Sequence, residues 1–311
     1  MSTRSLKTDT NRRVRHDLDD ALAKIAAGAA GRDARPAFPE GPVKELAATG
    51  VLALPVPDRI GERGRRATFA EEWSVLRAVA RADGSVGRIL DGHFNGVERL
   101  SLLAPEPLRS AELGAVAEGR LLLGVWGADP IPGEGTPARL VERGNGLRLS
   151  GVKTFCSGST GLDRSLVLVR DLGGDPGPPL VAYVDLSAGV EVDRSWFAGA
   201  GMRASESHRV VFDRAPVLAV LGEPGELVRE PFFSRDATRT AVTWAGIADA
   251  AVAATLDVLA AKSGGKEPDD VVSLAAGRML AAQGTIDRWI EHAAARADAD
   301  PRDSLAGFST E

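Results

Sequence analysis

The sequence predicts an α+β chain with a helical N-terminal domain at residues 1–118, an antiparallel β-barrel middle domain at residues 119–222 and a helical C-terminal domain at residues 223–311. Two changes of hydrophobic pattern predict these boundaries. Before Gly119, apolar residues recur at steps of three and four, which is typical of amphipathic helices. After Gly119 the pattern changes to short apolar runs separated by Gly, Pro and Asp, and helical composition returns after Glu223.

The N-terminal region carries its helical pattern in two stretches. Apolar side chains at helical spacing mark them as follows: Leu18, Leu22 and Ile25 in the first, and Phe69, Trp73, Leu76 and Val79 in the second. Between the two stretches, the apolar run at 50–57 contains Pro55 and Pro57, which cannot continue a helix. We therefore expect a loop there.

The middle region contains seven short apolar runs that we predict to be strands. They lie at residues 121–126, 139–142, 147–155, 166–170, 180–185, 190–193 and 209–212. Asn145-Gly146, directly before the third run, is a hairpin turn signal. Because no helical pattern separates the runs, the spacing favours an antiparallel barrel or sandwich over alternating βαβ units. Two long helices follow in the C-terminal region, at 241–261 and 271–296.

Composition excludes several classes of function. The 38 basic and 43 acidic residues give a net charge of -5 and form no basic block, so we expect no nucleic-acid partner. A single cysteine, Cys156, excludes an intrachain disulfide framework, and the scattered His16, His208 and His292 predict no metal site. The N-terminus lacks an apolar leader, and no 18 uncharged apolar residues run together. We expect a cytoplasmic protein with no membrane partner.

The stretch Gly-Val-Lys-Thr-Phe-Cys-Ser-Gly at 151–158 is the most informative part of the chain. A strand pattern here ends in Phe155, Ser157 and small neighbours, so an aromatic face, a hydroxyl and bare backbone lie within reach of a flat ligand. The isoalloxazine ring of a flavin is such a ligand.

Three further segments agree with this one in order and spacing. They read Arg-Ala-Asp-Gly-Ser-Val-Gly at 81–87 leading to Gly92-His93, Val-Trp-Gly-Ala-Asp-Pro at 125–130, and Gly-Met-Arg-Ala-Ser at 201–205 followed by a strand pattern. Over residues 15 to 260 the sequence resembles the acyl-CoA dehydrogenase superfamily of flavoproteins. It is most similar to the branch that contains dibenzothiophene monooxygenase.

The resemblance implies a bound flavin, FAD with FMN as an alternative, and four cofactor-binding positions. Phe155 matches the aromatic beside the ring, and Ser157 matches the hydroxyl that bonds flavin N5. Ala128 replaces the family's flavin-binding threonine, so only its backbone N–H remains to bond the ring. Trp126 is either a wall of the site or an inward-facing core residue. For Phe155 the alternative is a core position. For Ser157 it is a residue that caps the strand end or faces solvent.

The resemblance also suggests two catalytic residues. His93 matches a histidine that borders the oxygen-reacting site in the monooxygenase branch, with a satisfied core histidine as the alternative. Asp236 lies ten residues before Gly246, where branched-chain members carry their catalytic glutamate, and a carboxylate there would abstract an α-proton. The alternative for Asp236 is a helix N-terminal residue that forms salt bridges with Arg235 and Arg239.

The C-terminal region departs from the family, which ends in four long helices. Only two long helical patterns fit after Glu223, and Lys-Ser-Gly-Gly-Lys-Glu-Pro at 262–268 replaces the expected Arg-x-x-Phe-Gly segment. We therefore expect a shortened C-terminal domain that lacks the arginine for the flavin pyrophosphate.

Three hypotheses about function follow. The first is a flavin-dependent oxidoreductase that dehydrogenates an acyl thioester, with Asp236 or another base. The second is a reduced-flavin-dependent monooxygenase of the dibenzothiophene type, which needs no carboxylate base. The third is a degenerate, non-catalytic homologue that acts as a partner subunit. We expect a small-molecule substrate, and the Ala-rich helix at 241–261 also predicts a homo-oligomer.

Overall fold

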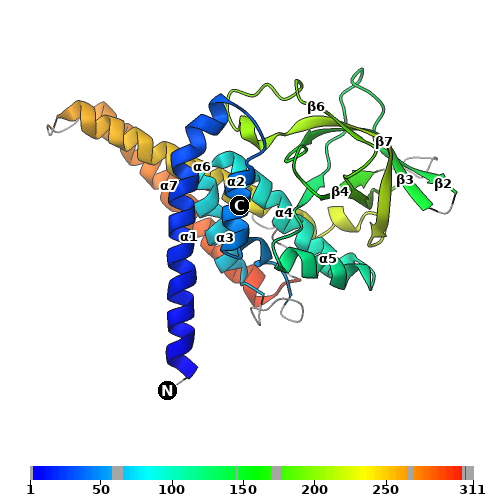
Figure 1. The fold of residues 1–311 in the computed structure, drawn as a ribbon. Helices are drawn as coiled ribbons and strands as arrows, with labels where there is room; N and C mark the ends of the chain where they lie inside the picture. Colours follow the sequence, from blue (N-terminus) through cyan, green and yellow to red (C-terminus); the bar gives the residue numbers. More distant parts are fainter. Residues whose placement is uncertain are drawn as a thin grey trace.

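The computed structural model describes residues 3–57, 66–144, 146–169, 177–264, 266, 269–302 and 305. Helices precede and follow a seven-stranded sheet, which confirms the predicted fold class (Figure 1). The change from helix to strand falls between Ala117 and Leu123, and the change back falls between Leu221 and Phe232. The division into three domains stays a prediction.

The described residues of the N-terminal part form five α-helices and one 3₁₀ turn. They are α1 (Thr3–Ala34), α2 (Glu40–Ala48), η1 (Val51–Ala53), α3 (Phe69–Ala82), α4 (Gly84–Leu103) and α5 (Leu108–Ala117). Local capping defines two of these starts. Thr68 and Glu71 form a reciprocal capping box at α3, and the Asp83 side chain accepts the backbone N–H groups of Ser85 and Val86 at α4. The proline-containing run forms only the short η1 turn, as expected of a loop.

The α3 residues that showed helical spacing form the centre of the helical core. Trp73, Leu76 and Val79 are fully buried, and α3 packs against α4 and α6. The opposite side of α4 packs against the sheet at β1. Helix α4 therefore lies between the helical core and the sheet.

The sheet contains β1 (Leu123–Trp126), β2 (Arg139–Arg143), β3 (Gly146–Cys156), β4 (Arg164–Val169), β5 (Leu180–Asp185), β6 (Val190–Asp193) and β7 (His208–Leu221). The strand order is β1-β4-β5-β7-β3-β2, and β6 also pairs with β7. Each strand overlaps a predicted one. The expectation of a purely antiparallel barrel is wrong for one pair, because β1 and β4 run parallel. The β2–β3 hairpin lies between them in the chain and is long enough to bring β4 back in the direction of β1.

Two long helices, α6 (Phe232–Ser263) and α7 (Asp270–Ala299), follow the sheet. Helix α6 begins nine residues before the predicted start at 241, because its first turns bury arginines rather than an apolar stripe: Arg235 and Arg239 are 3% and 0% exposed. The C-terminal half of α6 and the N-terminal half of α7 project away from the rest of the molecule (Figure 1). By length and composition alone, α6 is the one helix in the described part of the chain that could span a membrane, which is weak evidence for such a role.

Candidate functional site

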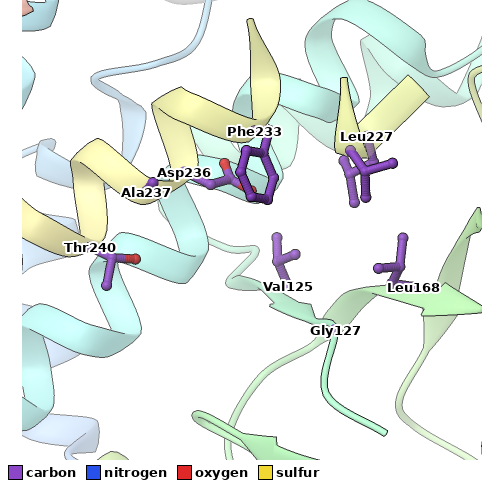
Figure 2. Close-up of a pocket in the computed structure, with 9 residues that line it drawn as sticks. Val125, Gly127, Leu168, Leu227, Phe233, Asp236, Ala237 and Thr240 are labelled. Atoms are coloured by element: carbon purple, nitrogen blue, oxygen red, sulfur yellow. The ribbon is translucent and has the colours of Figure 1, made fainter. Parts of the chain in front are cut away.

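A pocket of about 310 Å³ lies between the first turns of α6 and the sheet edge formed by β1 and β4 (Figure 2). Most of its lining side chains are apolar. They come from the strands (Val125, Gly127, Leu168), from the η3 turn at Glu226–Val228 (Leu227, Val228) and from α6 (Phe233, Asp236, Ala237, Thr240). This composition suits a small ligand with an apolar ring or chain.

Asp236 is the one ionisable residue of the pocket lining. One carboxylate oxygen pairs with the Arg99 guanidinium of α4, and the other, Oδ1, has no hydrogen-bond partner among the described residues. Burial raises the pKa of Asp236, and the opposing effect of Arg99 is smaller. Asp236 does pair with an arginine, but this arginine is not the predicted Arg235 or Arg239.

Arg235 and Arg239 belong to a buried ion-pair network between the start of α6 and helices α3 and α4. Arg239 bonds Glu72 of α3 and Glu98 of α4, each at 2.6 Å, and Arg235 bonds the other oxygen of Glu98 at 2.5 Å. All four side chains are at most 4% exposed. Because the network ties the start of α6 to α3 and α4, it holds the α6 wall of the pocket in place.

Phe155 lies at a bulge near the end of β3. The pairing of β3 with β7 slips between Lys153 and Cys156, and Phe155 has a left-handed backbone with φ 51°. Its ring is 59% exposed and packs edge-on against Trp196 at 4.8 Å, so the core alternative is wrong. A non-glycine residue in this conformation costs roughly 1–3 kcal/mol, and such strain clusters at functional sites. An exposed aromatic here is a candidate ligand contact.

Ser157 follows directly in the turn after β3. Its hydroxyl lies 2.9 Å from the Ser207 hydroxyl, which lies 2.8 Å from that of Ser205. Its carbonyl accepts the indole N–H of Trp126 at 3.0 Å. Trp126 is 1% exposed and packs against Phe212, so of its two predicted positions the structure has the inward-facing one, beneath the turn.

Ala128 lies beside this turn because the chain after β1 is held against β3. The Ala128 carbonyl accepts the backbone N–H of Thr154 at 3.0 Å. Buried Lys153 bonds the Gly127 carbonyl at 3.1 Å and the Asp129 carboxylate at 2.7 Å. The exposed Ala128 and Phe155 and the partly exposed Ser157 thus come from adjacent chain segments. The pocket is lined by Val125 and Gly127, which directly precede Ala128 in the chain.

His93 lies elsewhere, buried between α4, η1 and the start of β1, and does not line the pocket. The Leu123 N–H donates to Nδ1 at 3.1 Å, so Nε2 carries the proton and donates to the Leu52 carbonyl at 3.0 Å. Burial lowers the pKa of His93 to about 4, against a weaker opposing effect of the Leu52 bond. Both nitrogens of a neutral ring are engaged, which favours the core alternative. Its catalytic role stays a prediction.

The stability of the fold should depend on pH through His93. The folded-state pKa near 4 lies below the ordinary 6.5, so the unfolded chain takes up the proton at higher pH than the folded chain. The contribution of neutral His93 is therefore complete above pH 6.5 and declines as the pH is lowered from 6.5 to 4. Urea unfolding of wild type and His93→Gln across this range measures it. Equal pH slopes for the two proteins would contradict the assignment.

Sequence reasoning missed two parts of this site. Trp196, which supports Phe155, lies in a loop with no family motif, and the neighbouring Trp196-Phe197 pair among polar residues was the available signal. Ser207 lies just beyond the 201–205 motif, and its contact with Ser157 joins segments 50 residues apart.

Comparison with known proteins places these features in a family context. Residues 8–120 match the acyl-CoA dehydrogenase N-terminal domain. The dibenzothiophene monooxygenase of Rhodococcus qingshengii is 29% identical over 194 residues, which are 60% of this chain and 44% of that protein. An amino sugar nitrososynthase of Streptomyces rubradiris is 32% identical over 212 residues, which are 65% of this chain and 49% of that protein. The matches thus span less than half the length of these curated relatives.

Solved structures agree in fold. A nitrososynthase from Micromonospora carbonacea var. africana superimposes with a TM-score of 0.76 at 27% identity, covering 94% of this chain and 77% of that one. FMN-bound TdsC, a dibenzothiophene monooxygenase from Paenibacillus sp. A11-2, gives a TM-score of 0.75 at 21% identity, covering 92% and 77%.

Proposed function

We propose that this chain, a member of the acyl-CoA dehydrogenase superfamily, is a flavin-dependent monooxygenase that acts on a small, largely apolar substrate. Our first sequence-based hypothesis, dehydrogenation of an acyl thioester, becomes the second candidate. The curated relatives are monooxygenases and a nitrososynthase, which supports the oxygenating alternative. When bound, reduced flavin supplies the two electrons with which one atom of O₂ enters the substrate and the other leaves as water.

The observation that carries the proposal is an apolar pocket whose lining includes Val125 and Gly127, the residues just before Ala128 in the chain. The exposed Phe155 ring offers a face for the flavin, and the Ser157 hydroxyl offers a hydrogen bond at its edge. The apolar pocket on the other side of the β1 end would take the substrate and exclude water. The residues present therefore fit a flavin.

We propose FMN rather than FAD as the cofactor. FMN has a single phosphate, so it does not require the pyrophosphate arginine that the sequence lacks at 262–268. TdsC, which has the same fold, is described as FMN-bound. Equal or tighter binding of FAD in a direct titration would contradict this choice.

One observation keeps the dehydrogenase as a second candidate. Asp236 lines the pocket, burial raises its pKa, and its Oδ1 has no hydrogen-bond partner in the described part of the chain, which are properties of a general base. The ion pair with Arg99 counts against it, because a carboxylate held by an arginine is a weaker base.

Two assays on the flavin-loaded protein separate these reactions. Oxygen consumption that requires externally reduced FMN and a small apolar substrate such as indole would support the monooxygenase. Anaerobic bleaching of the flavin by an acyl-CoA would contradict it and support the dehydrogenase. An Asp236→Asn variant should retain oxygenation and lose any bleaching.

Ser157→Ala should weaken the binding of oxidised FMN about five- to ten-fold, because one hydrogen bond to the ring is lost. Visible-absorption titration of both proteins measures the change. Ser165→Ala is the control for loss of a serine hydroxyl outside the site, since Ser165 is buried on β4 and donates to the Gly124 carbonyl at 3.3 Å. Equal affinities of Ser157→Ala and the control for FMN would show that the Ser157 hydroxyl does not bond the flavin.

We also propose that the chain self-associates through α6 and α7. Large apolar side chains are exposed along these helices, among them Trp244 at 52%, Val271 at 77% and Leu274 at 58%. Contiguous exposed apolar side chains mark association surfaces. Light scattering should therefore give a mass above 32.5 kDa, which Leu274→Lys reduces. A stable monomer at micromolar concentration would contradict this proposal.

A further inference from the structure

We infer that Ser205 and Ser207 are positioning residues that orient the Ser157 hydroxyl as a hydrogen-bond donor toward a bound flavin. The inference rests on the proposed flavin site. Its basis is the row of three hydroxyls that runs from the partly exposed Ser157 through Ser207 to Ser205 in the interior. Ser207 is 6% exposed and Ser205 is 1% exposed.

The direction of the hydrogen bonds follows from the number of acceptors. Each serine hydroxyl has one proton, so the row points inward or outward, or Ser157 and Ser205 both donate to Ser207. In the last case the Ser207 proton would have no acceptor among the described residues. If the row points inward, Ser205 must donate to a further acceptor, and within the described residues the Ser207 hydroxyl is its one hydrogen-bond partner. A buried donor without an acceptor is costly. If the row points outward, Ser205 donates to Ser207, Ser207 donates to Ser157, and Ser157 donates to the ligand. In the outward direction every hydroxyl proton has an acceptor.

The backbone around Ser205 and Ser207 holds this arrangement. Met202 and Glu206 both have left-handed backbones, with φ 56° and 48°, on either side of the 3₁₀ turn at Arg203–Ser205. The Gly158 N–H donates to the Ser205 carbonyl at 2.7 Å, which joins this turn to the one that carries Ser157. Two such residues in a short segment indicate that its surroundings enforce the conformation.

A fixed donor discriminates between the two redox states of a flavin. Ser157 would find an acceptor lone pair at N5 of the oxidised ring. It would meet an N–H at the same position of the reduced ring, which can only donate. The intact row should therefore favour oxidised over reduced flavin. Breaking the row frees the Ser157 hydroxyl to rotate and accept from the reduced ring.

The experiment compares dissociation constants of oxidised and anaerobically reduced FMN for wild type, Ser205→Ala, Ser207→Ala and Ser207→Thr. The ratio of the reduced to the oxidised constant should fall about five-fold in both alanine variants, as expected for one hydrogen bond. Ser207→Thr, which keeps the hydroxyl, should return the ratio toward wild type. The Ser165→Ala control should leave it unchanged.

The outcomes separate the two proposals. Failure of wild type to bind FMN in either state would overturn the proposed function and this inference with it. Binding by wild type with an unchanged ratio in both alanine variants would overturn the inference alone. A ratio that falls equally in Ser165→Ala would also overturn it, because the effect would then not depend on the row of hydroxyls.

Discussion

Replacing Arg239 by methionine should lower the free energy of unfolding by about 3 kcal/mol, the lower end for removing one partner from a buried ion pair. The Arg239 side chain is fully buried and bonds Glu72 and Glu98, both of which also lie in the interior. Each carboxylate keeps one other arginine, Arg66 for Glu72 and Arg235 for Glu98, so the charge is only partly uncompensated. The loss should also loosen the start of α6 and with it the pocket.

Urea unfolding of wild type and Arg239→Met measures this effect. Arg288→Met is the matched control, because Arg288 is 85% exposed and its pair with Glu291 lies on the surface of α7. Exposed pairs contribute little, so the control should unfold like wild type. Equal stability of Arg239→Met and the control would contradict a structural role for the network.

The network also predicts that the free energy of unfolding decreases at acid pH. Burial raises the pKa of Glu98, but the guanidinium groups of Arg239 and Arg235 outweigh it together and lower the pKa to about 2. The stability that Glu98 contributes is therefore present above its ordinary value near 4.5 and is lost as the pH falls toward 2. This loss should be smaller in Arg239→Met, since the lowered pKa depends on Arg239.

Gly246→Ala should destabilise the chain by about 1–3 kcal/mol, although alanine is the better helix former. A methyl group at Gly246 on α6 would lie 2.3 Å from the Arg77 carbonyl oxygen and 2.9 Å from the Arg81 nitrogen of α3. Both are backbone atoms, which cannot rotate away. The two helices would have to separate where α6 also carries Arg239 and Thr240.

For Gly277→Ala we expect the opposite effect, an increase in the free energy of unfolding. Gly277 lies on α7, is exposed, and has no atom within 4 Å of an added methyl group. The substitution should raise the free energy of unfolding by about 0.5–1 kcal/mol through helix propensity. If Gly246→Ala raised the free energy of unfolding as Gly277→Ala does, the close approach of α3 and α6 would be wrong.

Much of the fold was predictable because its strands and most of its helices follow simple periodic patterns. Strands β5 and β6 begin and end where the apolar runs do. The start of α6 was not predictable in this way, since its buried face presents Arg235 and Arg239, which a hydrophobic pattern assigns to solvent. The parallel pairing of β1 and β4 depends on contacts between distant segments, which no local pattern encodes.

The candidate site was only partly visible in the sequence. The family motifs named Ala128, Phe155 and Ser157, and the structure holds Ala128 against the end of β3, next to the other two. Their contact with a flavin stays a prediction. The motif at His93 does not reveal that both ring nitrogens bond backbone, because Leu52 and Leu123 are brought together only by the fold. Ser207 and Trp196 act through neighbours far away in the chain. Their contacts with Ser157 and Phe155 could therefore be identified only from the structure.

A visible-absorption titration of the purified apo protein with FMN tests the proposed flavin site beside Phe155 and Ser157. We expect a saturable spectral shift with one flavin per chain, weakened in Ser157→Ala and retained in Ser165→Ala. Absence of any shift with FMN or FAD up to the solubility of the flavin would rule out the flavin site and favour a non-catalytic homologue that keeps the fold without the cofactor.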